Sequence, residues 1–155
     1  MTTFDTIYDS FLSKVTDDMY MELTEEQTKA MLKSLFINSL PHFEFPRFDL
    51  HDYNLELEEY NIDLENEEVN IISTYMVVEW LSDQVASVEN TRMKYSGSDF
   101  KFTSQANHLH KLIQLKKEYE RLGFHLQRLY KRRKKDDKGI YRSTLGTIMD
   151  TTEGR

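Results

Sequence analysis

Cysteine is absent from the 155 residues of this sequence. Its absence excludes disulfide bonds, thiolate-ligated zinc, iron–sulfur clusters and a cysteine nucleophile. No apolar run approaches the ~20 residues of a membrane-spanning helix. The first residues are neither basic nor apolar, so we expect no secretory signal. Five glycines and two prolines leave few residues for turns, which favours long helices.

Charge is divided unevenly along the chain. Residues 1–90 contain 20 of the 27 acids and four bases, a net charge of −16, whereas residues 91–155 contain 16 bases and seven acids, a net charge of +9. Such asymmetry is typical of chains that bind nucleic acid, a membrane surface or an oppositely charged partner. It also allows copies to associate through the acidic half of one and the basic half of the next. Composition alone leaves these alternatives open.

Two amphipathic helices are predicted before Pro41. The first covers 4–15, where Phe4, Ile7 and Phe11 repeat with helical spacing. The second begins at Thr24, which with Gln27 forms the pattern of a capping box. It must end near Pro41, because the residue before a proline disfavours helical geometry.

Residues 42–63 depart from the helical pattern. The stretch 55–58 alternates leucine and glutamate with period two, which predicts short strands or an extended arm. The segment is too long and too aromatic for a plain connection, so it is either folded back on the core or offered to a neighbouring subunit. The candidate residues of an inter-subunit arm are its large aromatic side chains: Phe43, Phe45, Phe48, Tyr53 and Tyr60.

Two long helices are predicted in the second half of the chain, separated by a loop at 94–99. The first covers 66–91 and is apolar over so much of its circumference that it must be the central core element. The second covers about 103–134 and has a heptad-spaced stripe: Leu112, Leu115, Tyr119, Leu122, Leu126 and Leu129. That stripe either packs against the 66–91 helix within the chain, as an antiparallel hairpin, or recruits a partner helix.

The predicted fold is therefore all-α. We expect a small helical bundle in residues 1–134, built on two long antiparallel helices, with an extended aromatic arm at about 42–63. Residues 135–155 are polar, with few apolar residues, and we expect an extended C-terminal tail that is disordered alone.

No catalytic, nucleotide-binding or metalloprotease motif occurs in the sequence. His108 and His110 are two residues apart, so on a helix they face different directions and do not suit one metal ion. The acidic run at 56–68 lacks the spacing and the glycine of a calcium loop. We expect no catalytic residue, no metal and no cofactor, and therefore no enzyme.

A basic cluster is the strongest candidate for a binding site. Six bases lie within residues 128–135, and such a field attracts phosphates or an acidic protein surface. The alternative is the solvated basic end of a helix, which the helix dipole favours. The candidate contact residues for an anionic partner are Arg128, Lys131, Arg132, Arg133, Lys134, Lys135, Tyr141 and Arg142.

The order of elements and three short segments resemble one protein family. The segments are 78–81 (Val-Glu-Trp-Leu), 93–101 (Met-Lys-Tyr-Ser-Gly-Ser-Asp-Phe-Lys) and 104–109 (Ser-Gln-Ala-Asn-His-Leu). Over roughly residues 1–134, the chain resembles the head–tail connector (adaptor) proteins of tailed bacteriophages.

The resemblance implies a structural, non-enzymatic virion protein. Its copies would form a closed ring, commonly twelve-fold, in the neck of the virion after assembly in the host cytoplasm. The ring would join the portal protein to a tail or neck protein, and DNA would pass through its channel without sequence-specific binding. Residues 138–155 stand where such proteins carry a portal-docking segment. Two other classes remain open: a nucleic-acid-binding or regulatory helical protein that uses residues 128–135, and a helical scaffold that recruits a partner through the leucine stripe.

Overall fold

The structure is a computed structural model in which residues 1–15, 23–94 and 102–143 are described, and it is mostly helical. In chain order the elements are α1 (Phe4–Leu12), α2 (Glu25–Ser39), the 3-10 helix η2 (Leu40–His42), β1 (Tyr53–Asn54), β2 (Glu59–Tyr60), α3 (Asn66–Lys94), α4 (Phe102–Arg132), β3 (Arg133–Lys135) and β4 (Tyr141–Ser143). Among the described residues, no helix is long and apolar enough to cross a membrane. Most of the predicted loop at 94–99 and the end of the predicted tail, 144–155, lie outside the described residues.

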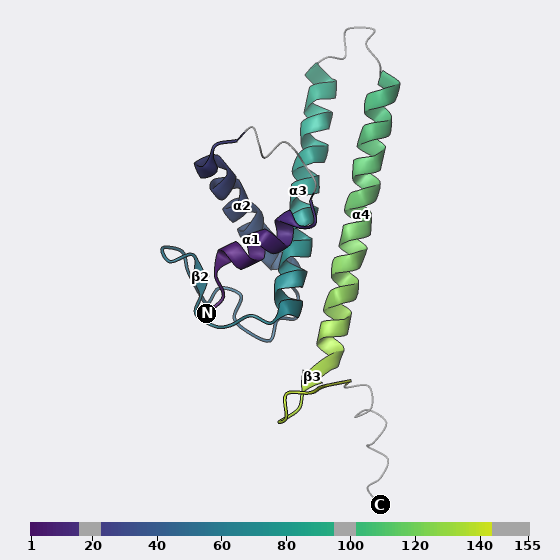
Figure 1. Cartoon of the computed structure of the whole chain (residues 1–155). Coiled ribbons are helices and arrows are strands. Elements are labelled where there is room, and N and C mark those ends of the chain that lie inside the picture. Colours follow the sequence, from purple (N-terminus) through teal and green to yellow (C-terminus); the bar gives the residue numbers. More distant parts are fainter. Residues whose placement is uncertain (16–22, 95–101, 144–155) are drawn as a thin grey trace, which may run out of the picture.

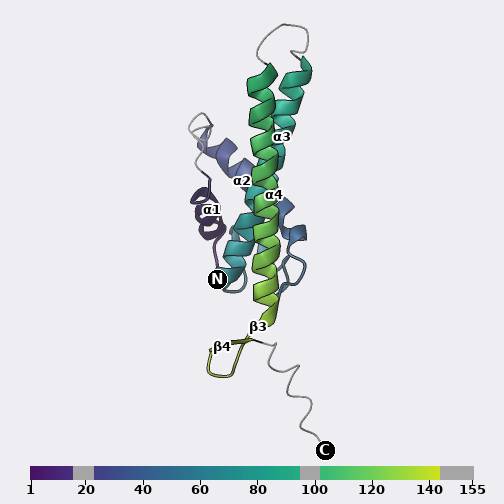
Figure 2. The same ribbon diagram turned by 90° about the vertical axis from the view of Figure 1, so that its right-hand side faces the viewer.

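Helix α3 is the central element, as predicted from its apolar circumference. Every residue from Ile71 to Val78 is buried, because α1, α2 and α4 all pack against this helix. Figure 1 shows α3 and α4 side by side, with α1 and α2 against the lower part of α3 only. In Figure 2, α4 covers the front of the molecule along the length of α3. The upper ends of the two helices therefore extend beyond the rest of the body.

The first two helices follow their local sequence signals. In α1, Phe4, Ile7 and Phe11 are fully buried, as the spacing predicts. At the start of α2, the Thr24 hydroxyl accepts a hydrogen bond from the Gln27 backbone N–H at 3.3 Å, and the Gln27 side chain accepts one from the Thr24 N–H at 3.1 Å. The predicted capping box is therefore confirmed. Helix α2 ends at Ser39, and Pro41 lies inside η2.

The prediction of an extended inter-subunit arm at 42–63 is wrong for four of its five candidate aromatic residues. Phe43 and Tyr60 are buried in the chain's own core, and Phe48 and Tyr53 pack partly buried against it. The Tyr60 ring meets the rings of Phe48 and Tyr53 edge to face, a geometry that aromatic pairs favour. Burying these rings locally removes their surface from water without a partner subunit. Of the five candidate aromatic side chains, Phe45, at 46% exposure, is the one that remains available to a neighbour.

The predicted leucine stripe of α4 is wrong at two of its six positions. Leu129 is partly buried, like Leu112, Tyr119 and Leu126. Leu112, Tyr119 and Leu126 pack against the core, but Leu115 and Leu122 are 40% and 42% exposed. The face that meets α3 instead alternates these three residues with Leu109, Lys116, Gly123 and Tyr130. At Gly123 the Tyr75 ring lies so close that an added Cβ would be 2.7 Å from Tyr75 Cζ. This close approach of α3 requires a residue without a side chain.

The predicted disordered tail begins with a β-hairpin. Strands β3 and β4 pair antiparallel, with Lys134 opposite Arg142. The Asp136 carboxylate accepts hydrogen bonds from the backbone N–H groups of Lys138 and Ile140, at 3.0 and 2.9 Å. Gly139 has φ +76°, a left-handed conformation that glycine adopts without a steric penalty. Asp136 and Gly139 thus stabilise the turn that joins β3 to β4.

Candidate docking groove on α4

The predicted basic cluster does not form one continuous surface, because α4 ends inside it at Arg132. Arg133 turns back to Glu67 of α3, with 2.7 Å between Nη1 and Oε1. Arg142 pairs with Asp136 at 2.8 Å within the C-terminal hairpin. Arg132 and Lys134 are exposed, and the side chains of Lys135 and Tyr141 lie outside the described residues. Arg128 and Lys131, one helical turn apart, remain together on α4.

Arg128 and Lys131 border a hollow of about 210 Å³ between α4 and the segment that carries Glu44 and Phe45. Its other lining residues are Glu44, Phe45, Phe124 and Gln127, and we call this hollow the α4 groove. Phe45 and Phe124 are large apolar side chains that are 46% and 52% exposed. The groove therefore presents two aromatic rings beside two cationic side chains.

Each cation of the groove lies over one of the aromatic rings. Lys131 Nζ is 4.0 Å from the centroid of the Phe45 ring, and the Arg128 guanidinium carbon is 5.9 Å from the centroid of the Phe124 ring. Contacts of this kind are worth about 0.5–1 kcal/mol at exposed sites. These contacts hold the charged groups beside the rings. A ligand that has both a carboxylate and an apolar group would therefore contact a cation and a ring at the same time.

Gln127 fixes the floor of the groove. Its side chain is 3% exposed. Its amide nitrogen donates hydrogen bonds to the His42 carbonyl at 2.7 Å and to the Tyr75 hydroxyl at 2.6 Å, and its oxygen accepts one from the Glu44 N–H at 2.8 Å. A buried amide with several partners defines one position for the chain around it. Gln127 thereby holds the segment that carries Phe45 against α4.

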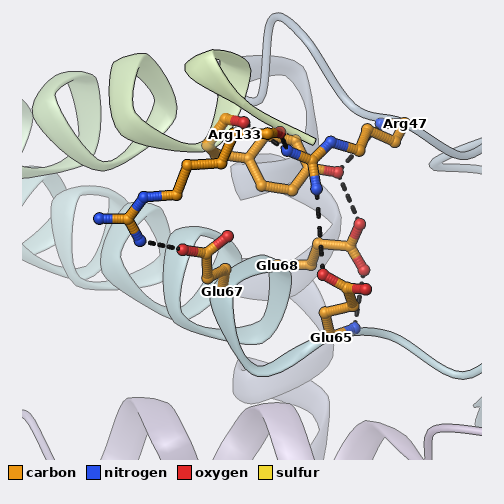
Figure 3. Close-up of polar contacts among 6 residues, drawn as sticks. Arg47, Glu65, Glu67, Glu68 and Arg133 are labelled. Atoms are coloured by element: carbon orange, nitrogen blue, oxygen red, sulfur yellow. Dashed lines mark hydrogen bonds and ion pairs between the residues drawn. The ribbon is translucent and has the colours of Figure 1, made fainter. Parts of the chain in front are cut away.

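A second network attaches the same segment at the lower end of α4. The Tyr130 hydroxyl donates to Glu68 Oε1 at 2.6 Å and accepts from the Arg47 backbone N–H at 3.1 Å. The Arg47 guanidinium lies 3.9 Å from the centroid of the Tyr130 ring and donates to the carbonyls of Tyr130 and Arg133. Figure 3 shows Arg47 directed towards Glu65 and Arg133 directed towards Glu67. The end of α4 is therefore tied to both α3 and the 42–47 segment.

The raised pKa values of Tyr130 and Tyr75 favour a structural role for both side chains, as neutral hydrogen-bonding groups. Burial, together with the hydrogen bond to Glu68, raises the pKa of Tyr130 well above its ordinary value. Burial also raises the pKa of Tyr75, against the smaller opposing effect of its hydrogen bond with Gln127. Both hydroxyls thus stay protonated at neutral pH, and Tyr130 remains a hydrogen-bond donor to Glu68.

The histidine pair considered in the sequence lies on α4. His108 and His110 are both exposed on α4. Across residues 1–15, 23–94 and 102–143, no group of three or more His, Asp or Glu side chains is placed to hold a metal ion. His42, whose ring stacks on Tyr75, instead contacts Glu79 at 2.7 Å.

Sequence reasoning found three of the groove residues and missed the others. Arg128 and Lys131 belong to the predicted basic cluster, and Phe45 belongs to the predicted arm. Phe124 was missed, although it lies four residues before Arg128, a spacing that places two side chains on one helical face. Gln127 gives no signal in the sequence, because its role depends on His42 and Tyr75, which are distant along the chain.

Comparisons with protein-family models, with curated proteins and with solved structures find no match to this chain. The candidate function therefore rests on the geometry of the α4 groove, on the charge distribution and on the resemblance of segments 78–81, 93–101 and 104–109.

Proposed function

We propose that this protein is a structural assembly subunit, a head–tail connector of a tailed bacteriophage, that binds protein partners through the α4 groove. The observation that carries the proposal is the pair of exposed rings, Phe45 and Phe124, held beside Lys131 and Arg128. Exposed aromatic and arginine side chains are the residues that most often dominate protein interfaces.

The size of the groove favours a protein partner over a small molecule. At about 210 Å³ it is smaller than the roughly 300–1,000 Å³ of typical ligand pockets. It suits one or two inserted side chains from a partner, with the cations contacting acids around them. In the proposed assembly, α3 and α4 are the two long antiparallel helices of the bundle and form the rigid support for this contact.

The proposed setting is the neck of a virion. Copies would form a ring between a portal protein and a tail or neck protein, with DNA in the channel. In the connector family that the sequence resembles, such rings are commonly twelve-fold. The negative charge of residues 1–90 and the positive charge of residues 91–155 support contacts between unlike surfaces. The C-terminal residues from 138 onward are the proposed portal-docking segment.

The test is an affinity capture from the producing cells with an N-terminal tag, with and without nuclease, followed by mass spectrometry and electron microscopy. The proposal expects portal and tail components that survive nuclease, and ring-shaped particles with a central channel. The variant Phe124→Ser with Lys131→Glu should lose at least one of these partners. Lys111→Glu, which reverses one charge on another part of α4, is the matched control and should keep them. Recovery of neither portal nor tail components would overturn the proposal.

A second candidate function is binding of single-stranded nucleic acid. The observation that favours it is again the placement of exposed rings beside cations. Nucleobases stack on aromatic side chains, while lysine and arginine side chains contact the phosphates. In that case affinity for an oligonucleotide should fall steeply as salt is raised, and the captured partners should disappear with nuclease. If the protein does not bind the oligonucleotide even at low salt, this candidate function is eliminated.

A further inference from the structure

A second exposed feature carries charge opposite to that of Arg128 and Lys131 in the α4 groove. The turn between β1 and β2, residues 54–59, presents Leu55 and Leu57, which are 47% and 66% exposed. Glu56, between the two leucines, is also exposed, and Glu58 and Glu59 follow. Glu58 pairs with Lys33 at 3.6 Å, so the turn offers its two leucines together with the carboxylate of Glu56. The α4 groove offers two aromatic rings with two cations and one acid, Glu44.

The turn is held in one conformation by several backbone contacts. The Asn54 side-chain oxygen accepts hydrogen bonds from the N–H groups of Glu56 and Leu57 at 2.8 and 3.2 Å. The Phe4 N–H donates to the Glu58 carbonyl at 2.8 Å, and Thr3 forms a β-bridge with Glu59. A surface loop fixed in this way loses little conformational freedom when it binds.

Backbone strain is concentrated at the same turn. Glu58 has φ +52°, the only positive φ among the described non-glycine residues. This left-handed conformation is unfavourable for a side chain with a Cβ and persists only where surrounding contacts impose it. Here it allows the turn to present Leu55 and Leu57 to solvent while residues 2–4 hold its base through backbone hydrogen bonds.

The turn and the groove of one copy lie on different sides of the molecule. Figure 1 shows the turn beside β2, projecting from the side of the body opposite α4. Neither feature therefore covers the other within one chain. The same two surfaces on neighbouring copies are free to meet.

We propose that the 54–59 turn of one copy inserts into the α4 groove of the next. Leu57 enters the hollow between Phe45 and Phe124, and Glu56 contacts Lys131 or Arg128. The contact is heterologous, so it repeats from copy to copy and forms a ring when the rotation closes, or a filament when it does not. The inference rests on the proposed function and deepens it by naming a second copy of the chain as the partner in the α4 groove. Loss of portal or tail components in the Phe124→Ser with Lys131→Glu variant would then follow from loss of the ring.

The first experiment measures self-association of the full chain by sedimentation velocity at protein concentrations up to about 1 mM, the range in which weak contacts are populated. We expect oligomers whose formation weakens at least about tenfold with Leu57→Ser, with Glu56→Lys or with Lys131→Glu. Glu89→Lys and Lys111→Glu are matched charge reversals elsewhere on α3 and α4, and both should leave association unchanged. Combining Glu56→Lys with Lys131→Glu should restore association to within about threefold, because the opposite charges are exchanged.

The second experiment uses the absence of cysteine. A copy carrying Leu57→Cys is mixed with a copy carrying Phe124→Cys under mild oxidation. A disulfide-linked heterodimer should form several-fold faster than with Leu57→Cys and Lys111→Cys as the pair. Equal rates for the two pairs would overturn the contact even where the chain self-associates.

The outcomes separate this inference from the proposed function. A chain that stays monomeric throughout the concentration range overturns the contact, and so does an oligomer that is insensitive to Leu57→Ser and Lys131→Glu. In either case, capture of portal and tail components would still support the connector proposal. Conversely, oligomers that respond as expected, without capture of such components, would support the contact and reject the connector.

Discussion

The two ends of α3 differ in their surroundings although they belong to one continuous helix. Its lower end is buried on all sides between Ile71 and Val78, whereas none of residues 82–90 is fully buried. The lower end is enclosed by α1, α2 and α4, while the upper end extends past α1 and α2 beside α4 (Figure 1). The stability of the fold therefore resides mainly in the lower end, and the upper end should open at a lower free-energy cost.

The largest expected effect compares two valines on one face of α3, seven residues apart. Val78 is 2% exposed, and Val85 is only partly buried. We expect Val78→Ala to lower the free energy of unfolding by about 2–3 kcal/mol, because it removes two buried carbons and leaves a cavity. Val85→Ala should cost less than about 1 kcal/mol. Urea denaturation of both variants measures the difference, and equal losses would contradict the comparison.

Tyr130→Phe tests the network at the lower end. The change removes one hydrogen bond from the Glu68 carboxylate, which is 5% exposed, and leaves the Arg47 N–H without its acceptor. Hydrogen bonds to buried charged groups are strong, so we expect a loss of about 1.5–2 kcal/mol in thermal or urea unfolding. Tyr119→Phe, the same change nearer the middle of α4, is the control and should cost less than about 0.5 kcal/mol. A loss no larger than that of the control would show that the network contributes little.

Gly123→Ala tests the close approach of the two long helices. Alanine favours a helix by about 1 kcal/mol over glycine, but its Cβ would lie 2.7 Å from Tyr75 Cζ. Tyr75 is held by Gln127 and by stacking against His42, so we expect a net loss of about 1 kcal/mol. In a Tyr75→Ala background the same change should become stabilising. Stabilisation by Gly123→Ala alone would mean that Tyr75 moves aside freely.

The smallest effect is local and concerns the C-terminal hairpin. Hydrogen bonds from the Ile140 N–H, the Arg142 side chain and the Lys138 N–H lower the pKa of Asp136. A carboxyl group with a lowered pKa contributes stability above its unfolded pKa of about 4, and that contribution disappears as the pH falls through the lower folded value. The amide chemical shifts of Lys138 and Ile140 should therefore change together in acid. Asp136→Asn should abolish this transition and Asp137→Asn should keep it; a transition retained in Asp136→Asn would assign it to another group.

Local signals in the sequence predicted most of the helices. The spacing of Phe4, Ile7 and Phe11 predicted the buried face of α1, and Thr24 with Gln27 predicted the start of α2. These signals suffice because capping and amphipathic spacing involve residues within one or two turns. The basic residues of the α4 groove were visible for the same reason, as a cluster of charge along the chain.

The face of α4 that packs inward was not predictable in this way. Two heptad stripes of α4 share Leu112, Tyr119 and Leu126. One is completed by Leu115 and Leu122, and the other by Lys116 and Gly123; hydrophobicity alone favours the first. The structure uses the other, because Gly123 admits the Tyr75 ring, while Lys116 extends to Glu120 at 3.8 Å. A lysine can cover apolar surface with its stem while its charge stays in water. The rejected stripe leaves Leu122 on the outer surface.

The sequence by itself determined where helices begin, that the helix at 66–91 is the central element, and that positive charge gathers near the end of α4. Only the tertiary structure decided that most aromatic residues of 43–60 enter the chain's own core, which face of α4 packs inward, and that Phe45 lines one hollow with Phe124, Arg128 and Lys131. The physical reason is that helix formation and capping depend on near neighbours in the chain. The choice of a buried face depends on the shape of the surface against which it packs, and residues distant in sequence create that surface.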